Sequence, residues 1–378
     1  FLHEARTLQA EAPALAMEVL CVALAVAAMR RTGRARTLLA LASGLALALG
    51  TLIKLLDIVA IVPIVLYLAV PVFATFARDD GYLRRPTAEA LRPALRETLR
   101  PLGWVMGGAI VGAVVVLAPF AGSFGALWDQ VVRFHIVAAG AEPAGLLHNA
   151  RIIVGGMKTL GIPALLALGL ALWQRAWRMV PPLLWLGASG LLLVRQAPLF
   201  DHHIVLVIPC LALIAALGLT VLPRPTGEQA QRWLAPGFSA VLALCLLIGV
   251  TLGVRSAWSD ARGPSADTAQ IVGAIASFTT PGQPIVTDDQ YAAALADRST
   301  PPELVDTSSV RITAKYLTAA QLEAILSRPD TRFVVLASGR LQLTPGFMPW
   351  LTANYRELVD LGAGRGIYER APTGSPIV

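Results

Sequence analysis

The sequence predicts a polytopic α-helical membrane protein with about eight spans in this chain, followed by a small C-terminal α/β domain. Hydrophobic residues make up 56% of the 378 residues and charged residues only 15%, whereas soluble domains average about 25% charged residues. The apolar residues occur in long runs that approach the roughly 20 residues needed to cross a bilayer. From about Arg262 onward the composition becomes that of a soluble domain. A soluble globular enzyme does not fit this composition.

Eight apolar segments are candidates for membrane helices, and several contain Gly and Pro, which membrane helices tolerate. The predicted spans are residues 12–30, 37–53, 56–77, 102–121, 152–174, 179–195, 203–222 and 233–254. We therefore assign residues 1–258 to a transmembrane region.

Basic residues are concentrated in every second loop between the predicted spans, and such loops face the cytoplasm. The formal charge of +7 is therefore a topology signal, and we expect no nucleic-acid partner. The opposite loops hold all five histidines: His3, His135, His148, His202 and His203. Because charged groups at membrane depth are retained where they line a cavity, we expect a site on the outer face of the plasma or inner membrane.

Residues 262–378 alternate helix-like and strand-like stretches, which is typical of a small α/β layer domain. The topology places this domain on the extracytoplasmic side, and "RGPS" from Arg262 to Ser265 is the predicted linker. The acidic pair in "TDDQ", Thr287 to Gln290, follows a predicted strand and favours a helix N-cap over a metal site. Three cysteines in apolar runs indicate neither a disulfide framework nor a metal site.

Two short stretches near the first predicted spans carry charges at membrane depth. Glu11 precedes Pro13 and suits the first turn of a helix, with Arg6 nearby and Glu18 on the same face seven residues later. Glu11 is either a cap at the interface or a carboxylate in a polar cavity. In "GTLIKLLD", Lys54 either holds a phosphate as a point charge or extends to the interface beside Asp57.

"WDQVVRFHIVAAG", Trp128 to Gly140, is predicted to form an amphipathic helix on the outer surface of the membrane. Trp128 would lie at the level of the lipid headgroups. The helix is either a structural element of the interface or a cover over a lipid-facing site, with Arg133 and His135 near the lipid or the acceptor.

"RQAPLFDHH" places Arg195, His202 and His203 in one short connection between apolar runs. Adjacent residues of a helix point about 100° apart, so we do not expect both histidines to bind one metal ion, and no metal site is predicted. An arginine beside a histidine is suited to an anionic oxygen such as that of a phosphate. The alternative is a polar loop at the membrane interface.

Together these stretches resemble the GT-C superfamily of membrane glycosyltransferases, in the branch that contains protein O-mannosyltransferases and lipid A aminoarabinose transferases. "ARTLQAEAPALAMEVL", "ASGLALALGTLIKLLD" and "PLFDHHIVLVIP" carry the resemblance. It implies that Arg6 and Glu11 line the active cavity as catalytic residues, and that Lys54, Arg195, His202 and His203 bind the donor phosphate. It also implies a catalytic acidic residue in a first outer loop, which would precede Phe1, so we expect the chain to be an N-terminally truncated fragment.

The resemblance implies sugar transfer from a polyprenyl-phosphate donor to a lipid, glycan or protein acceptor of the cell envelope, in contact with membrane lipids. No cofactor is certain, although a divalent metal is possible. Two alternatives stay open, namely a transporter and a non-catalytic membrane protein with an outer binding domain. The sequence shows no inverted pair of broken helices, which many transporters have.

Overall fold

The computed structural model describes residues 11–76, 86–141, 145–173, 177–221, 229–261 and 265–371. The chain divides into two compact units, of which the first comprises Phe1–Phe124 and Ala144–Ser259 and the second comprises Gly125–Pro143 and Asp260–Val378. The main division, at Ser259/Asp260, lies beside the boundary that the sequence predicts at 258–262. The inclusion of Gly125–Pro143 in the second unit was not foreseen.

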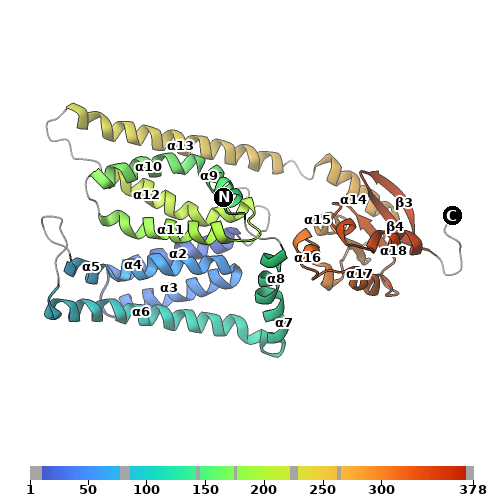
Figure 1. The fold of residues 1–378 in the computed structure, drawn as a ribbon, viewed down its shortest axis with the longest axis horizontal. Coiled ribbons are helices and arrows are strands. Elements are labelled where there is room, and N and C mark those ends of the chain that lie inside the picture. The colour runs from blue at the N-terminus through green and yellow to red at the C-terminus, as the bar shows by residue number, and fades with distance from the viewer. Residues whose placement is uncertain are drawn as a thin grey trace. The chain divides into compact units, whose positions relative to one another are not determined.

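The first unit is built from helices, coloured blue to yellow in Figure 1. They are α2 (Glu11–Met29), α3 (Gly33–Ile53), η1 (Leu55–Ala60), α4 (Ile61–Leu68), α5 (Val70–Phe76), α6 (Ala88–Leu117), η2 (Ala118–Ser123), α9 (Leu146–Gly156), α10 (Lys158–Trp173), η4 (Trp177–Met179), α11 (Val180–Arg195), η5 (Asp201–Val207), α12 (Ile208–Val221) and α13 (Gln229–Ala261). The helix α7 (Phe124–Trp128) begins at the boundary between the units.

Four helical stretches in the described residues are long and apolar enough to cross a membrane: Glu11–Met29, Gly33–Ile53, Ala88–Ala141 and Asp201–Gly218. The number rises to six if each of two bent helix pairs forms one span. All eight predicted segments fall on helices, but eight spans are not reached. Val180–Arg195, for example, has 16 residues, which extend only about 24 Å, less than the roughly 30 Å of the hydrocarbon core.

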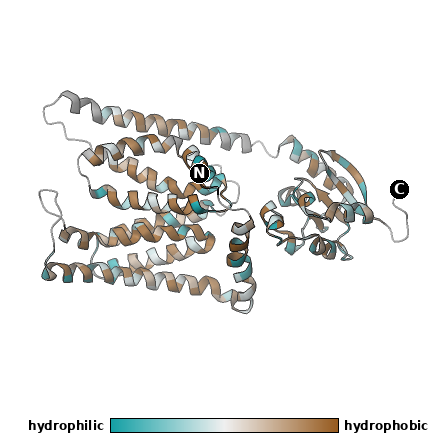
Figure 2. Ribbon diagram, viewed as in Figure 1, coloured by the Kyte–Doolittle hydropathy of each residue, from teal (hydrophilic) through white to brown (hydrophobic). Residues whose placement is uncertain are grey.

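Most residues of these helices are hydrophobic, as the brown ribbons of Figure 2 show. On α6, Ile110, Val111, Val114 and Val115 are all exposed. A contiguous apolar surface of this kind is unfavourable in water and marks contact with another apolar phase. Together with the helix lengths, it identifies the first unit as a helical membrane protein.

Glycines bring α3 and α6 into direct backbone contact. A Cβ atom on Gly44 would collide with the carbonyl oxygen of Val105, and one on Gly108 would collide with that of Leu41. Small residues at such contacts are typical of helix packing in membranes, where close approach replaces the hydrophobic effect as the source of stability.

The second unit contains a four-stranded sheet with the order β1-β2-β4-β3. Its strands are β1 (Ile285–Thr287), β2 (Phe333–Leu336), β3 (Tyr355–Gly362) and β4 (Arg365–Arg370). Strands β1 and β2 are parallel with Val286 opposite Val334, whereas β2–β4 and β3–β4 are antiparallel. The small α/β domain predicted for this region is confirmed.

Helices cover both faces of this sheet. Successive strand residues point to opposite sides, so each strand contributes side chains to both faces. Phe333, Val335 and Ile367 pack on one side, and Val334, Leu336 and Tyr368 pack on the other. The first side is covered by α14 (Ala266–Phe278) and α15 (Gln290–Leu295), and the second by α17 (Ala319–Leu326) and α18 (Phe347–Asn354). The remaining short helices of the unit are η3 (Asp129–Arg133), α8 (Phe134–Ala141), η6 (Pro302–Leu304), α16 (Ser309–Thr313) and η7 (Leu341–Leu343).

Candidate functional site

Three segments of the membrane unit bring polar side chains together. Glu11 is the first residue of α2, where a carboxylate complements the positive end of the helix dipole. Lys54 lies in extended backbone between α3 and η1. His202 and His203 lie in the first turn of η5. The sequence separation between Glu11 and the histidines exceeds 190 residues, so only the packing of the helices creates this cluster.

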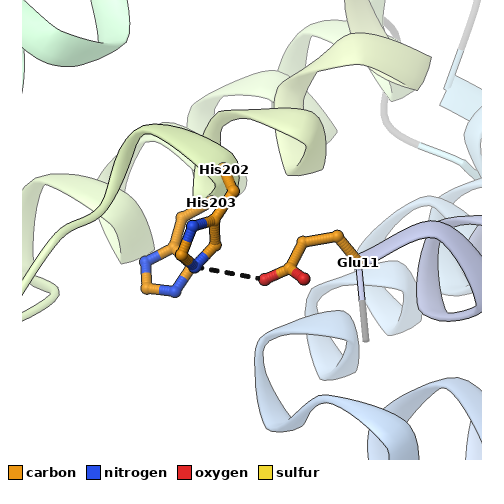
Figure 3. Close-up of side chains that lie close together, drawn as sticks. All are labelled: Glu11, His202 and His203. Atoms are coloured by element: carbon orange, nitrogen blue, oxygen red, sulfur yellow. Dashed lines mark ion pairs between the residues drawn. The ribbon is translucent and has the colours of Figure 1, made fainter. Parts of the chain in front are cut away.

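Glu11 is the centre of the cluster. Its side chain is 6% exposed, and its Oε1 accepts a hydrogen bond from the Lys54 ammonium. The same oxygen lies 3.3 Å from Nε2 of His202, whose side chain is 30% exposed. Figure 3 shows the Glu11 carboxylate and the two imidazole rings directed toward one another. Lys54 therefore pairs with Glu11, whereas the sequence offered Asp57 as its partner.

The two histidines converge, although adjacent residues of an α-helix point apart. Their rings are perpendicular, with centroids 4.6 Å apart, and the His202 ring stacks on Phe200 at 5.4 Å. One ligand atom each from Glu11, His202 and His203 lies within 4.8 Å of the others. The expectation that the spacing separates the rings is wrong, because the two side chains turn toward each other even though adjacent residues of the 3₁₀ helix η5 point about 120° apart.

Two further carboxylates lie deeper in the same unit. Glu18 is 1% exposed and Asp57 is 4% exposed. Oε1 of Glu18 accepts a hydrogen bond of 3.2 Å from the Trp185 indole. The other oxygen of Glu18 and Oδ2 of Asp57 have no hydrogen-bond partner among the described residues. Buried polar atoms are rarely left this way unless a ligand, an ion or a water satisfies them.

A small cavity of about 10 Å³ connects these groups, and its polar lining residues are Glu11, Glu18, Lys54, Asp57 and His203. A space of this size holds roughly one water molecule or one ion. Three carboxylates and one ammonium give the lining an excess of two negative charges when all are ionised. Buried charges that are not paired are costly, so a bound cation would lower the cost of this excess.

The donor atoms of the cluster fit a divalent transition metal. Two imidazole nitrogens and one carboxylate oxygen form the three-ligand set of many catalytic zinc sites, which leave a fourth position for water or substrate. One divalent cation would also cancel the excess negative charge of the lining. Glu11, His202 and His203 are the described residues that would hold it.

Asn149 fixes the loop that leads to the histidines. Its side chain is 2% exposed, and its amide group donates to the carbonyl oxygens of Val194 at 3.0 Å and Gln196 at 2.8 Å. These carbonyls belong to the end of α11, where backbone acceptors lack partners within the helix. Asn149 therefore sets the direction in which the chain leaves α11 toward His202.

The structure brings together four of the eight residues that the sequence singled out: Glu11, Lys54, His202 and His203. Arg195 ends α11 with an exposed side chain, and no ion pair joins it to Glu11 in the described part of the chain. Arg6 lies outside the described residues.

Arg133 and His135 belong to the second unit. There Arg133 pairs with Asp129 at 3.2 Å, and Nδ1 of His135 lies 2.7 Å from the Val131 carbonyl oxygen. Their closeness to lipid or acceptor stays a prediction.

Sequence reasoning missed Trp185 and Asn149 at this site. An isolated Asn in an apolar helix is a weak signal for a buried cap, and a Trp gives no signal at all, because membrane helices carry Trp for other reasons. No family model, no curated protein and no solved structure matches this chain. The geometry of the site and the apolar helices around it therefore carry the functional assignment.

Proposed function

We propose that this chain transfers a sugar from a polyprenyl-phosphate donor to a hydroxyl acceptor at the membrane surface. The supporting observation is the convergence of Glu11, Lys54, His202 and His203 at the ends of apolar helices. Charged groups at membrane depth mark functional sites by default. A phosphate attached to a lipid tail is the kind of substrate that needs both a polar centre and an apolar surround.

The reaction forms one bond and breaks one bond at the anomeric carbon of the sugar. The acceptor oxygen attacks this carbon, the bond to the phosphate oxygen breaks with inversion, and polyprenyl phosphate leaves. The hydroxyl proton passes to the carboxylate base that the family resemblance implies. The charge that grows on the leaving phosphate is the charge that the protein must stabilise.

Lys54, His202 and His203, together with Arg195, are the proposed phosphate-binding residues. Lys54 is suited to this role because its ammonium is already held at the cluster by Glu11. Glu11 and Arg6 would orient the sugar or the acceptor. A divalent cation on Glu11, His202 and His203 would supply further positive charge for the phosphate, and it would offset the negative lining that otherwise repels an anion.

An apolar cavity in the same unit is suited to the lipid tail of the donor. It has a volume of about 390 Å³ and is lined by Met157, Leu165, Leu168, Leu183, Leu211 and other apolar residues. A chain of isoprene units has no polar group to satisfy, so a lining of this kind binds it without penalty. We further propose that the site and the C-terminal domain face the extracytoplasmic side.

The test is sugar transfer by the full-length protein in liposomes. Radiolabelled polyprenyl-phosphate hexoses are supplied, and release of polyprenyl phosphate is followed for the wild type and for Glu11→Gln. We expect release by the wild type and a loss of about 10²-fold or more in the variant, which is typical of a lost electrostatic contact in an active site. Glu97→Gln, an exposed carboxylate paired with Arg36, is the control and retains activity.

No release with any donor by folded protein would contradict the proposal and favour a transporter or a non-catalytic membrane protein. Equal release by the wild type and by Glu11→Gln would support the transfer reaction but would show that Glu11 takes no part in it.

A further inference from the structure

The segment between α6 and α9 packs on the C-terminal domain through one of its faces. Ala138 is buried against Val310 and Ala314, with Phe134 and Tyr316 beside them. Phe134 and Tyr316 meet edge to face, with ring centroids 5.2 Å apart. More than 170 residues of sequence separate the two sides of this contact. The contact explains why Gly125–Pro143 belongs to the second unit.

Arg311 in α16 is the centre of this contact. Its guanidinium donates a hydrogen bond of 2.9 Å to the side-chain oxygen of Gln130. It also lies over the rings of Phe134 at 5.2 Å and Tyr316 at 5.8 Å, distances at which an arginine and an aromatic ring attract each other. The Tyr316 hydroxyl lies 3.4 Å from Oδ1 of Asp129 and donates to it. The Arg311 side chain is only 16% exposed, so these interactions are partly shielded from water.

Other side chains of the same segment are apolar and exposed. Ile136 is 68% exposed, Trp128 is 54% exposed, and Val137 is also exposed. Arg133 is also exposed, with 70% of its side chain accessible, and pairs with Asp129. An exposed tryptophan, exposed aliphatic residues and a basic residue in one short helical segment are typical of helices that lie in the lipid headgroup layer.

Chain length places this segment at the bilayer surface. Arg100 and Asp129 enclose residues 101–128, which contain no charged side chain. A helix that begins to cross the hydrocarbon core at Arg100 has risen about 30 Å, the full thickness of that core, near Phe120. Trp128 follows only eight residues later, which is a rise of at most about 12 Å as helix, so residues 125–141 begin close to the bilayer surface.

We propose that residues 125–141 form an interfacial strap whose Trp128, Ile136 and Val137 side chains insert into the lipid headgroup layer, and that Arg311 latches the C-terminal domain onto this strap. The strap would hold the C-terminal domain at the bilayer surface. This contact would be additional to the linker that precedes the domain in the chain. This inference rests on the membrane fold and the contacts of the second unit, and it does not depend on sugar transfer.

Spin labels on the full chain in lipid nanodiscs test the lipid contact. Labels are placed at Trp128→Cys and at Ile136→Cys, with Leu343→Cys, an exposed position of the same domain, as the control. The partly exposed Cys245 is replaced by alanine in all variants. We expect collisions with oxygen, relative to a water-soluble nickel chelate, to be several-fold higher at positions 128 and 136 than at position 343. Equal values at all three positions would overturn the proposal, as would shielding of 128 and 136 from both reagents, since protein would then cover these side chains.

The latch is tested by Arg311→Ala, with Arg328→Ala as the matched control. Arg328 is a surface arginine of the same domain, paired with Glu303 at 2.6 Å, and contacts no strap residue in the described part of the chain. In nanodiscs, trypsin should cut the Arg133–Phe134 bond several-fold faster in Arg311→Ala than in the wild type or in Arg328→Ala. Unchanged cleavage in Arg311→Ala, in a domain that retains its unfolding midpoint, would show that no latch exists.

Discussion

Buried carboxylates occur in both units, and they differ in how their oxygens are satisfied. In the C-terminal domain, Asp288 is fully buried and accepts hydrogen bonds from four backbone N–H groups between Ala337 and Leu341, at 2.7–3.3 Å. In the membrane unit, Glu18 and Asp57 are nearly as buried, yet each has an oxygen without a partner among the described residues.

The difference separates a structural carboxylate from a candidate site. Asp288 follows β1, and its carboxylate accepts hydrogen bonds from the backbone that follows β2. Both carboxylate oxygens therefore have partners, and they join the ends of two parallel strands. Glu18 and Asp57 line a cavity that also reaches Glu11, Lys54 and His203. A saturated buried carboxylate stabilises the fold, whereas an unsaturated one beside other ionisable groups has capacity left for a ligand.

Removal of both histidines should have the largest effect on the membrane site. We expect the full-length wild type, after incubation with zinc and dialysis, to retain about one ion per chain. The His202→Ala/His203→Ala double variant should retain none, because two of the three ligands are lost. Metal content is measured by mass spectrometry, with the exposed His148→Ala as the control. Retention of the ion by the double variant, or absence of the ion from the wild type, would show that the two histidines do not form a metal site. The proposed difference between the two units would then be wrong.

Asp288→Ala should destabilise the C-terminal domain strongly. It leaves several buried N–H groups without an acceptor, and each such loss costs on the order of 1–3 kcal/mol, so we expect a loss of at least about 3 kcal/mol in the free energy of unfolding. The measurement is urea-dependent pulse proteolysis of this domain in the full chain. Glu303→Ala, which removes an exposed carboxylate, should have a small effect. Equal losses of stability in the two variants would show that the hydrogen bonds of Asp288 do not stabilise this domain.

Glu18→Gln should be tolerated far better than the corresponding change at Asp288. The glutamine keeps an acceptor for the Trp185 indole, and the atom that it replaces has no partner among the described residues. We expect a change below about 1 kcal/mol in apparent stability. Asp288→Asn, in contrast, turns an amide N–H toward backbone N–H groups and should lower the unfolding midpoint clearly. The unfolding midpoints of the two variants are compared by thermal unfolding of the solubilised full chain. A lower midpoint for Glu18→Gln than for Asp288→Asn would contradict the prediction.

A surface pair of the C-terminal domain gives the smallest expected effect, and it depends on pH. Arg365 donates to both oxygens of Asp267, at 2.8 and 3.0 Å, and this hydrogen bonding holds the pKa of the Asp267 carboxyl below its ordinary value. The folded state therefore gains stability above the ordinary pKa of Asp, about 3.9, and loses it as the pH falls through the lowered pKa. The difference in urea midpoint between the wild type and Arg365→Ala should be small at pH 6 and should vanish in strong acid. A difference that grows toward acid would contradict the assigned pair.

Several features of the fold followed from the sequence because they depend on local patterns. The apolar runs located the membrane helices, since length and hydropathy alone decide whether a segment can cross a bilayer. The acidic pair after β1 was predicted to favour a helix N-cap, and Asp289 caps α15 by accepting from the Ala292 N–H at 3.0 Å. The described residues show four to six spans and not the eight predicted, because apolar runs do not reveal where a helix bends or ends early, as at the 49° break between α4 and α5.

The candidate site was predicted residue by residue but not as a cluster. Glu11, Lys54 and His202 each stood out because a charged or polar group at membrane depth is rare. Their mutual contacts could not be predicted, since contacts between distant segments depend on which helices pack together. The strap contact of Arg311 was missed for the same reason.

The sequence by itself determined that the chain has a helical membrane region and a separate α/β domain, and which polar residues lie in or beside the apolar segments. These properties follow from composition and periodicity, which act over a few residues at a time. Only the tertiary structure decided that Lys54 pairs with Glu11, that two adjacent histidines converge on the same carboxylate, and that residues 125–141 belong to the C-terminal unit. The physical reason is that helix packing and side-chain rotamers, which bring distant residues within 3–5 Å, are set by the whole fold and leave no local trace in the chain.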